Sequence, residues 1–262
     1  MITLSSDFGT PYPAAMKGVI LKQCDARLVD VAHDFPRQDV RSTAFWLTQT
    51  LPEFPPAVHL IVVDPGVGTD RDALVVRAGD HVLVGPDNGV LFPPARALAG
   101  GDDDYSADID AYELDMGEPR SSTFHGRDVF APGAAAVHET GIDRLPELDC
   151  LSPASSVVDL TLPSPEFDGD AVTAAVLAVD DFGNVITNVP DTVLGDSDRV
   201  VVDGEERPVV DSYDHAAVGT AVVTVGSHGN VELAVNRGRG DDAFGVSAGG
   251  TVRLDGIDAD AV

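Results

Sequence analysis

The chain has 262 residues, 44% of them hydrophobic, which is enough to form one large domain or two modest ones. Its formal net charge of −28 leaves no basic patch to meet phosphates, so binding to nucleic acid is disfavoured. No run of about 18 apolar residues is present and the first residues lack the pattern of a signal peptide, so we expect a cytoplasmic protein without membrane contact.

Acidic residues are spread along the whole chain, with apolar runs between them, so they belong to the surface of a folded protein. At low salt the acidic side chains of such a surface repel one another and destabilise the folded protein. In about 1 M salt the screening length falls to about 3 Å, and this repulsion is largely removed. Because Lys17 and Lys22 are the only lysines, we favour a salt-loving cytoplasm over a merely acidic mesophilic protein. Cys24 and Cys150 match no CxxC spacing, so neither a zinc knuckle nor a disulfide framework is indicated.

The first half of the chain alternates between strand-like and helix-like segments. Short β-branched segments bounded by turn residues predict strands at 1–6, 26–32, 58–64, 73–79 and 81–86. Helices are predicted at 14–24, at 40–54 with an end near Pro52, and at 130–141. Strands separated by helices are typical of an α/β domain whose central, mostly parallel sheet is covered on both faces.

The second half has a different composition. Several prolines between 151 and 167 predict a connection. Short strand-like segments with turn signals follow it, and no long helical period appears. We therefore expect an α/β domain at 1–150, a linker at 151–167 and a small all-β domain at 168–262.

Polar residues follow two of the predicted strands. Asp7 is placed to accept hydrogen bonds from two sugar hydroxyls; alternatively, it caps the next helix from an ordinary turn. The loop DPGVGTDR has glycines that allow a sharp turn and close approach to a ligand, but it is neither a Walker loop nor GxGxxG. If this loop folds back, Arg71 meets Asp64 and keeps the carboxylate ionised; the competing interpretation is a structural ion pair.

Four further segments carry turn or charge signals. GPDNGVL at 85–91 is a strong turn signal, and on sequence alone a tight turn is the preferred interpretation. FHGRDVFAP at 124–132 fits a catalytic site, half of a metal site, or a surface loop whose Arg127 and Asp128 pair or cap a helix. No second ligand stands at metal spacing from the histidine, so a metal site is disfavoured. The Gly-Asn turns at 180–188 and 225–233 are explained by hairpins, with a ligand surface as the alternative.

Six motifs in one order carry a resemblance to a known family: DFG, VVDPGVGT-x-R, GPDNG, TFHGRD-x-FAP, DDFGN-x-ITN and GSHGN-x-E-x-AVN. Over nearly its whole length the chain resembles the S-adenosyl-L-methionine (SAM) hydroxide adenosyltransferases, or SAM hydrolases, which are relatives of fluorinating and chlorinating SAM enzymes. The resemblance implies a homotrimer of two-domain subunits with a β-barrel-like C-terminal domain. It also implies a site between the N-terminal domain of one subunit and the C-terminal domain of its neighbour, and hydrolysis of SAM to adenosine and L-methionine without a metal or other cofactor.

The resemblance also implies the roles of individual residues. The family's Asp-Arg-His set beside the attacking water falls here on Asp64, Arg71 and His125. Asp64 accepts a hydrogen bond from the water, Arg71 orients Asp64, and His125 holds the water from another side. The implied substrate contacts are the ribose hydroxyls on Asp7, the nucleoside pocket wall at Phe124, the methionine ammonium on Asp180, the adenine side at Phe182 and Asn184, and the methionine carboxylate on Ser227.

The chain departs from its relatives near the methionine end of the substrate. The segment after DFG is shorter than in many relatives and lacks an aspartate, and His228 stands where the fluorinating relatives have arginine. A SAM-dependent halogenase that uses chloride is one alternative, but halogenating relatives have a neutral tyrosine at the position of Asp64. A carboxylate about 4 Å from an attacking anion costs about 4 kcal/mol at an effective dielectric of about 20. A non-catalytic SAM or adenosine sensor is the other alternative, and the intact Asp-Arg-His set argues against it.

Overall fold

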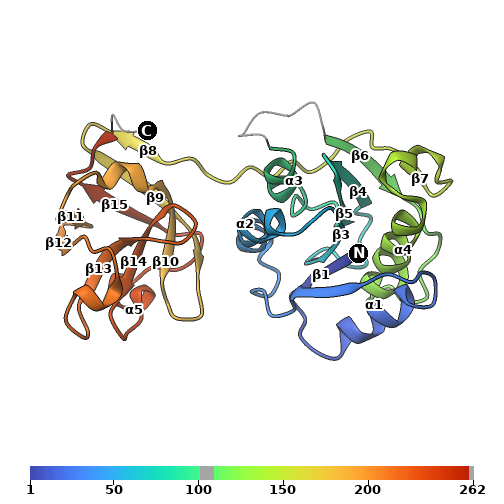
Figure 1. Cartoon of the computed structure of the whole chain (residues 1–262), viewed down its shortest axis with the longest axis horizontal. Coiled ribbons are helices and arrows are strands. Elements are labelled where there is room, and N and C mark those ends of the chain that lie inside the picture. The colour runs from blue at the N-terminus through green and yellow to red at the C-terminus, as the bar shows by residue number, and fades with distance from the viewer. Residues whose placement is uncertain (101–108, 260–262) are drawn as a thin grey trace. The chain divides into compact units, whose positions relative to one another are not determined.

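The computed structural model describes residues 1–100 and 109–259. The chain divides into two compact units, Met1–Thr161 and Leu162–Val262 (Figure 1). The division falls inside the segment 151–167 that we expected to be a linker, and each end of that segment carries a short strand of the nearer unit. Among the described residues, no helix is long and apolar enough to cross a membrane.

Seven strands form the sheet of the first unit. They are β1 (Ile2–Ser6), β2 (Leu28–Ala32), β3 (Val58–Val62), β4 (Ala73–Ala78), β5 (His81–Pro86), β6 (Ile109–Leu114) and β7 (Leu151–Pro153). Their order in the sheet is β2-β1-β3-β5-β4-β6-β7. The first four strands in this order are parallel to one another, and each later pair, from β5–β4 onward, is antiparallel. The carboxyl ends of β1 and β3 therefore lie side by side, at the edge where ligands gather in sheets of this kind.

Helices cover both faces of this sheet. They are α1 (Tyr12–Ile20), α2 (Val40–Thr50), α3 (Phe92–Leu98) and α4 (Ala131–Thr140), with 3₁₀ turns at Leu51–Glu53 and Ile142–Glu147 and a π-helical turn at Gly126–Phe130. In Figure 1, α1 and α4 lie on one side of the sheet, and α2 and α3 lie on the other. Successive residues of β3 point to opposite faces of the sheet. Leu60 and Val62 pack with α1 and α4, whereas Ile61 packs with α2 and α3.

The strands β4 and β5 form an antiparallel hairpin. Ala78 pairs with His81, and Gly79 between them has a φ of 54°, a left-handed conformation that glycine adopts without strain. The sequence pattern locates both strands but does not contain their pairing direction. The parallel arrangement that we expected is therefore found only across β2, β1, β3 and β5. The substrate-binding candidate Asp7 and the catalytic candidate Asp64 follow two of these strands.

The second unit is an antiparallel, nearly closed barrel. Its strands are β8 (Glu166–Asp168), β9 (Ala171–Val179), β10 (Val185–Pro190), β11 (Arg199–Val202), β12 (Glu205–Pro208), β13 (Ala221–Val225), β14 (Asn230–Val235) and β15 (Thr251–Asp255), with a short helix α5 (Gly240–Phe244) and 3₁₀ turns at Asp191–Leu194 and Tyr213–His215. They run in the order β12-β11-β15-β9-β10-β14-β13, with β8 beside β9. Val209, just after β12, bridges Val223 of β13, so the two edge strands meet. The predicted fold class, an α/β domain followed by a small barrel-like β domain, is confirmed.

Candidate functional site

Two predicted site residues stand directly after neighbouring parallel strands of the first unit. Asp7 follows β1 and Asp64 follows β3, and these strands pair in register from Ile2 with Val58 to Ser6 with Val62. The pairing places both carboxylates at the same edge of the sheet. Local strand patterns were sufficient to predict this arrangement, because the carboxyl ends of parallel neighbours coincide.

The loop that follows β3 folds back on itself, as one interpretation of the sequence required. Gly68 has a φ of 80°, and a Cβ atom there would lie 2.7 Å from the carbonyl oxygen of Ser122. Only glycine therefore allows the loop to pack against the segment that carries Phe124 and His125. The backbone N–H of Gly66 donates to Asp64 Oδ1 at 3.1 Å, which helps to fix that carboxylate.

Arg71 returns from this loop to hold Asp64 with two hydrogen bonds. Its Nε donates to Asp64 Oδ1 at 2.9 Å, and its Nη2 donates to Asp64 Oδ2. The side chains of Asp64 and Arg71 are only 6% and 11% exposed. The guanidinium also lies 4.9 Å from the ring centroid of Phe130, so packing as well as charge sets its position.

His125 completes a contiguous set with these two residues. Arg71 Nη2 is 3.0 Å from His125 Nδ1. Arginine has no acceptor, so Nδ1 must accept this hydrogen bond, and the ring proton of the neutral imidazole is placed on Nε2. Burial, together with the adjacent Arg71 cation, lowers the pKa of His125, which favours this neutral form. The arrangement thus combines an acceptor, Asp64, with a neutral ring that retains one N–H donor.

The position of His125 depends on the glycine that follows it. Gly126 opens the π-helical turn that leads into α4. A Cβ atom at Gly126 would lie 2.9 Å from Met16 Sδ and 3.2 Å from Val62 Cγ1, so a larger residue would displace the turn from the sheet. A close approach of backbone to β3 therefore sets the place of His125 beside Asp64.

A small pocket lies in front of this set. Its volume is about 90 Å³, and its lining includes Asp7, Asp64, Phe124 and His125. One buried water needs roughly 10–15 Å³ of such volume, so the pocket accommodates water or a small part of a ligand. Rings of Phe8, Tyr12 and Phe124 meet edge to face beside it, with centroids 5.3–6.2 Å apart. Tyr12 is 51% exposed, so this aromatic wall is open to a ligand.

Asp7 has a partner on the loop before α2. The backbone N–H of Gln38 donates to Asp7 Oδ2 at 2.7 Å, and Gln38 has a φ of 61°. Asp7 does not cap α1, because the residue at that cap is Pro11 and it makes no side-chain hydrogen bond. The capping alternative for Asp7 is therefore wrong, and its other carboxylate oxygen accepts no described protein donor.

Arg127 and Asp128 of the FHGRDVFAP stretch pair with each other and hold neighbouring segments together. The carboxylate of Asp128 is 1% exposed and receives hydrogen bonds from Arg127, from Arg120 and from the backbone N–H of Ser121. The hydrogen bond from Arg127 is the main cause that lowers the pKa of Asp128. The pair thus ties the loop before His125 to the π-helical turn after it.

The GPDNG motif is more than the tight turn that its sequence favoured. Asn88 Nδ2 donates to the carbonyl of Val63 at 2.9 Å, immediately before Asp64. Asp87 accepts the backbone N–H of Val158 at 2.8 Å, and a Cβ atom at Gly89 would lie 2.6 Å from Leu160 Cβ. The motif therefore supports the strand end that carries Asp64 and also holds the segment that leads out of the first unit.

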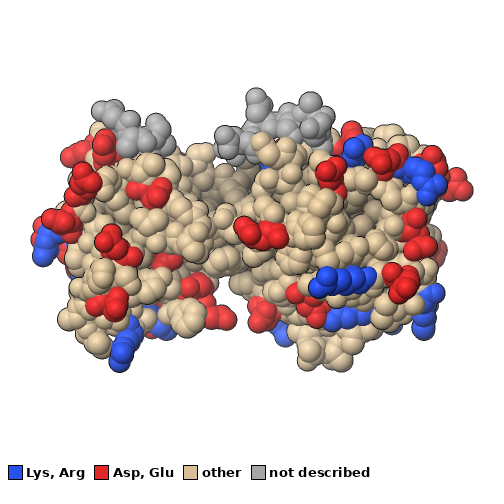
Figure 2. Space-filling model, viewed as in Figure 1, with Lys and Arg blue, Asp and Glu red and all other residues tan. Residues whose placement is uncertain are grey.

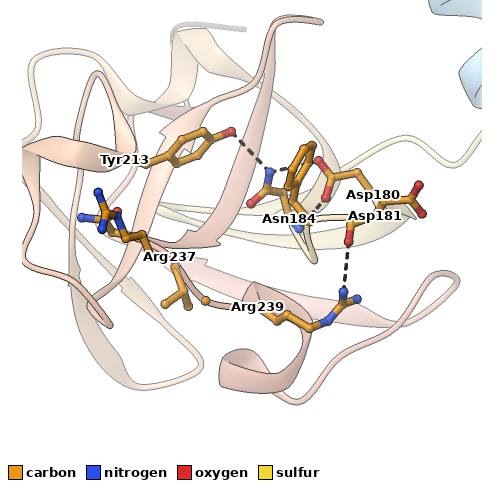
Figure 3. Close-up of a pocket in the computed structure, with 10 residues that line it drawn as sticks. Asp180, Asp181, Asn184, Tyr213, Arg237 and Arg239 are labelled. Carbon is orange, nitrogen blue, oxygen red and sulfur yellow. Dashed lines mark hydrogen bonds between the residues drawn. The ribbon is translucent and has the colours of Figure 1, made fainter.

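A larger pocket lies in the second unit. It has a volume of about 760 Å³ and is lined in part by Asp180, Phe182, Asn184 and Tyr213 (Figure 3). The ring of Phe182 is 78% exposed, which leaves its faces available for stacking. Three of the predicted substrate-binding residues, Asp180, Phe182 and Asn184, therefore line one pocket.

A hydrogen-bond network runs behind this pocket. Asp180 accepts the backbone N–H of Asn184 at 2.8 Å and its side-chain Nδ2 at 2.9 Å. The same Nδ2 is 3.4 Å from the Tyr213 hydroxyl, which donates to Glu232 Oε1 at 2.5 Å. Glu232 is 4% exposed, and this burial raises the pKa of its carboxyl. Burial is also the largest cause that raises the pKa of the Tyr213 hydroxyl, which therefore stays protonated.

Ser227 does not line either pocket. It lies exposed in the turn between β13 and β14. His228 beside it is half-buried, and burial lowers the pKa of its imidazole. A neutral ring at this position does not supply the cation that arginine would bring to a carboxylate.

Within residues 1–100 and 109–259, no group of three or more histidine, cysteine, aspartate or glutamate side chains is arranged to hold a metal ion. The free cysteines Cys24 and Cys150 are not bonded to each other.

Tyr213 and Glu232 were not predicted as members of the site. Tyr213 is 29 positions from Asn184, and no local pattern connects the two. Glu232 offered a signal, because it stands between the core residues Val231 and Leu233 in a strand whose other residues after Asn230 are apolar. A buried acid in such a strand needs a partner, but the sequence does not identify it as Tyr213.

The fold and the Asp-Arg-His set define a two-domain protein with polar side chains at the carboxyl ends of parallel strands. Family models of the SAM hydroxide adenosyltransferase N-terminal and C-terminal domains match residues 2–145 and 174–253, and the chain belongs to this family. It is 40% identical over 260 residues to an (R)-S-adenosyl-L-methionine hydrolase of Salinispora tropica, with 97% of each chain covered. A hydrolase of the same name from Thermus thermophilus is 39% identical, over 95% of this chain and 97% of that one.

Two solved structures share the fold of this chain over nearly its whole length. An uncharacterised conserved protein from Thermotoga maritima superimposes with a TM-score of 0.82 at 31% identity, covering 97% of this chain and 100% of the other. A conserved hypothetical protein from Thermus thermophilus gives a TM-score of 0.74 at 36% identity, with 97% and 98% covered.

Proposed function

We propose that this protein hydrolyses SAM to adenosine and L-methionine. The single observation that carries the proposal is Arg71, which holds Asp64 and the Nδ1 atom of His125 at the same time. The geometry leaves a carboxylate acceptor and an Nε2–H donor beside the pocket that both side chains line. Relatives named as SAM hydrolases at about 40% identity support the choice of substrate.

The reaction needs little from the protein beyond the placement of one water molecule. The sulfonium of SAM makes C5′ electrophilic, and the C5′–S bond breaks as a water oxygen bonds to C5′ from the opposite side. The leaving group is the neutral thioether of methionine, and the water gives up one proton. Asp64 accepts a hydrogen bond from the water and takes or relays that proton, while His125 donates Nε2–H to the water oxygen. Help of this kind contributes typically about 10²–10⁴-fold, in addition to the effect of alignment.

The remaining site residues bind the substrate in this proposal. Asp7 holds the ribose hydroxyls, and Phe124 forms a wall of the nucleoside pocket. The adenine contacts Phe182 and Asn184. Asp180 receives the methionine ammonium through lone pairs that its bonds to Asn184 leave open, since a carboxylate has about four acceptor sites. Ser227 meets the methionine carboxylate from its exposed turn.

The proposed assembly is a cytoplasmic homotrimer in which a neighbouring subunit supplies the C-terminal contacts. The molar mass from light scattering tests the trimer. Mixing Asp64→Asn subunits with Asn184→Ala subunits tests the shared site: in mixed trimers some sites receive two intact halves, so activity returns. No gain over the separate variants, together with a monomeric mass, would refute this arrangement.

A chloride-using halogenase is the less favoured reaction. Asp64 is a nearly buried carboxylate, and a chloride ion about 4 Å from it meets a repulsion of about 4 kcal/mol at an effective dielectric of about 20. A non-catalytic sensor is also disfavoured, because a protein that only binds adenosine does not require the Asp64–Arg71–His125 set.

Incubation with SAM, followed by chromatography, tests the proposed function. The wild-type protein should release adenosine and methionine in equal amounts, and Asp64→Asn should slow this by about 10²–10⁴-fold. Asp70→Asn is the matched control, because Asp70 is exposed in the same loop, and it should keep wild-type activity. SAM binding without release of adenosine in the wild type would favour the sensor, and 5′-chloro-5′-deoxyadenosine in molar NaCl would favour the halogenase.

A further inference from the structure

The network behind the larger pocket has a fixed hydrogen-bond polarity. Its two ends are carboxylates, Asp180 and Glu232, and an ionised carboxylate only accepts hydrogen bonds. The Tyr213 hydroxyl has one proton, which it donates to Glu232 at 2.5 Å. Toward Asn184 this hydroxyl can therefore only accept.

The polarity determines how the amide of Asn184 is turned. Its Nδ2 faces two acceptors, Asp180 Oδ2 at 2.9 Å and the Tyr213 hydroxyl at 3.4 Å. Turning the amide over would set its oxygen against both acceptors, so that orientation is excluded. Figure 3 shows the amide nitrogen and the Tyr213 hydroxyl pointing toward each other.

The carbonyl oxygen of Asn184 is consequently left for a ligand. Asn184 lines the pocket, and among the described residues no donor bonds this oxygen. The residue is 8% exposed, so a ligand that covers the oxygen without donating to it leaves a buried acceptor unsatisfied. A flat ring stacked on Phe182 that presents an amino group meets this requirement.

We propose that Tyr213 and Glu232 are positioning residues that set the polarity of Asn184 and so select a purine that bears a 6-amino group. The inference rests on the proposed function for the adenosine part of the substrate. Glu232 fixes the direction of the Tyr213 hydroxyl, and Tyr213 with Asp180 fixes the amide. Glu232→Gln would introduce an amide that both donates and accepts hydrogen bonds, and the direction of the network would be lost.

Binding of two nucleosides to the full-length protein tests this inference. Adenosine is compared with purine riboside, which has the same shape but lacks the 6-amino group, by isothermal titration calorimetry. Wild type should bind adenosine at least about tenfold more tightly, since an unsatisfied buried acceptor has a cost of that order. Glu232→Gln and Tyr213→Phe should reduce the ratio to about threefold or less, and Asn184→Ala should abolish it. Tyr112→Phe, which removes a tyrosine hydroxyl in the first unit, should keep the wild-type ratio.

Two results would overturn the inference: a wild-type ratio near one, or a ratio that survives in both Glu232→Gln and Tyr213→Phe. Each of these variants nearly preserves side-chain volume, and melting curves identify any that does not fold. With SAM as substrate, the two variants should raise KM more than they lower kcat, whereas general damage to the fold would lower kcat as well. Selective adenosine binding without SAM hydrolysis would refute the proposed function alone, and hydrolysis without selectivity would refute this inference alone.

Discussion

Arg71 and Asp64 form a bidentate ion pair. The guanidinium nitrogen Nη2, which bonds Asp64 Oδ2, also donates to His125 Nδ1 at 3.0 Å. One side chain thus orients both groups that we place beside the attacking water. The planar fork of arginine makes this possible, because its N–H donors point in fixed and different directions.

Replacing Arg71 by lysine keeps the charge and removes the fork. A single ammonium on a flexible stem cannot hold both oxygens of Asp64 and also His125 Nδ1 in this geometry. We expect Arg71→Lys to lower kcat for SAM by about 10²-fold, since misplaced catalytic groups have costs of that size. Arg77→Lys is the matched control, because the Arg77 side chain makes a long hydrogen bond to the Gly79 carbonyl, away from the site, and this variant should stay near wild type. Equal rates for wild type and Arg71→Lys would contradict the proposed role.

The neutral state of His125 predicts the acid limb of the pH profile. Burial and Arg71 lower the pKa of its imidazole below the ordinary value of about 6.5, so the ring stays neutral as pH falls through that value. Protonation at still lower pH would place a proton on Nδ1 against the Arg71 cation. We expect kcat/KM to stay level from about pH 8 to below about pH 6.5 and then to fall. His125→Gln should be slower and should lose this limb, and an activity loss centred above pH 7 would argue against a neutral His125.

We expect the Asp128 side chain to contribute more to the free energy of unfolding than an exposed acidic side chain does. Its carboxylate is 1% exposed and bonds to Arg120, Arg127 and the Ser121 N–H. Asp128→Asn should lower the free energy of unfolding by about 2 kcal/mol or more, because buried charge-assisted hydrogen bonds are lost. Glu206→Gln, which breaks the exposed pair with Arg199, should change it by about 0.5 kcal/mol or less. Urea unfolding checks both, and similar effects in the two variants would contradict this role of Asp128.

Gly89 is expected to tolerate no side chain. It has a φ of 92°, and a Cβ atom would lie 2.6 Å from Leu160 Cβ. Gly89→Ala should therefore cost about 1–3 kcal/mol more than Gly117→Ala. Gly117 shares the left-handed backbone, with a φ of 71°, but has open space around it. Thermal melts of both variants measure the difference, and identical losses would show that the contact with Leu160 is unimportant.

The acidic surface predicts a dependence of stability on salt. Acidic residues number 44 against 16 basic ones, and Figure 2 shows red acidic side chains scattered over the visible faces of both units. Raising salt from about 0.1 M to about 1 M shortens the screening length from about 10 Å to about 3 Å. We expect the melting temperature to rise by several degrees over this range in NaCl, and not in an equally concentrated neutral osmolyte. A flat or falling curve in NaCl would contradict adaptation to high salt.

The placement of Asp7, Asp64 and Arg71 in the first unit could be predicted from the sequence, because it depends on residues that are close together in the chain. Asp7 and Asp64 follow short buried strands, and glycines in the loop between Asp64 and Arg71 allow the loop to fold back. The network of the second unit is different. Its polarity depends on Tyr213, brought to Asn184 by a 3₁₀ turn outside any strand, and strand periodicity does not indicate which turns meet. The antiparallel pairing of β4 and β5 could not be predicted either, because the direction in which strands pair is determined by the whole sheet and not by the pattern of each strand.

The origin of the oxygen in the product tests the central claim most directly. In water enriched with oxygen-18, attack of water on C5′ of SAM transfers one labelled oxygen to the 5′-hydroxyl of adenosine. Mass spectrometry should therefore find adenosine heavier by the mass of one label and methionine with none. Unlabelled adenosine, label in methionine, or a product without adenosine would contradict the attack of an Asp64-bound water on C5′.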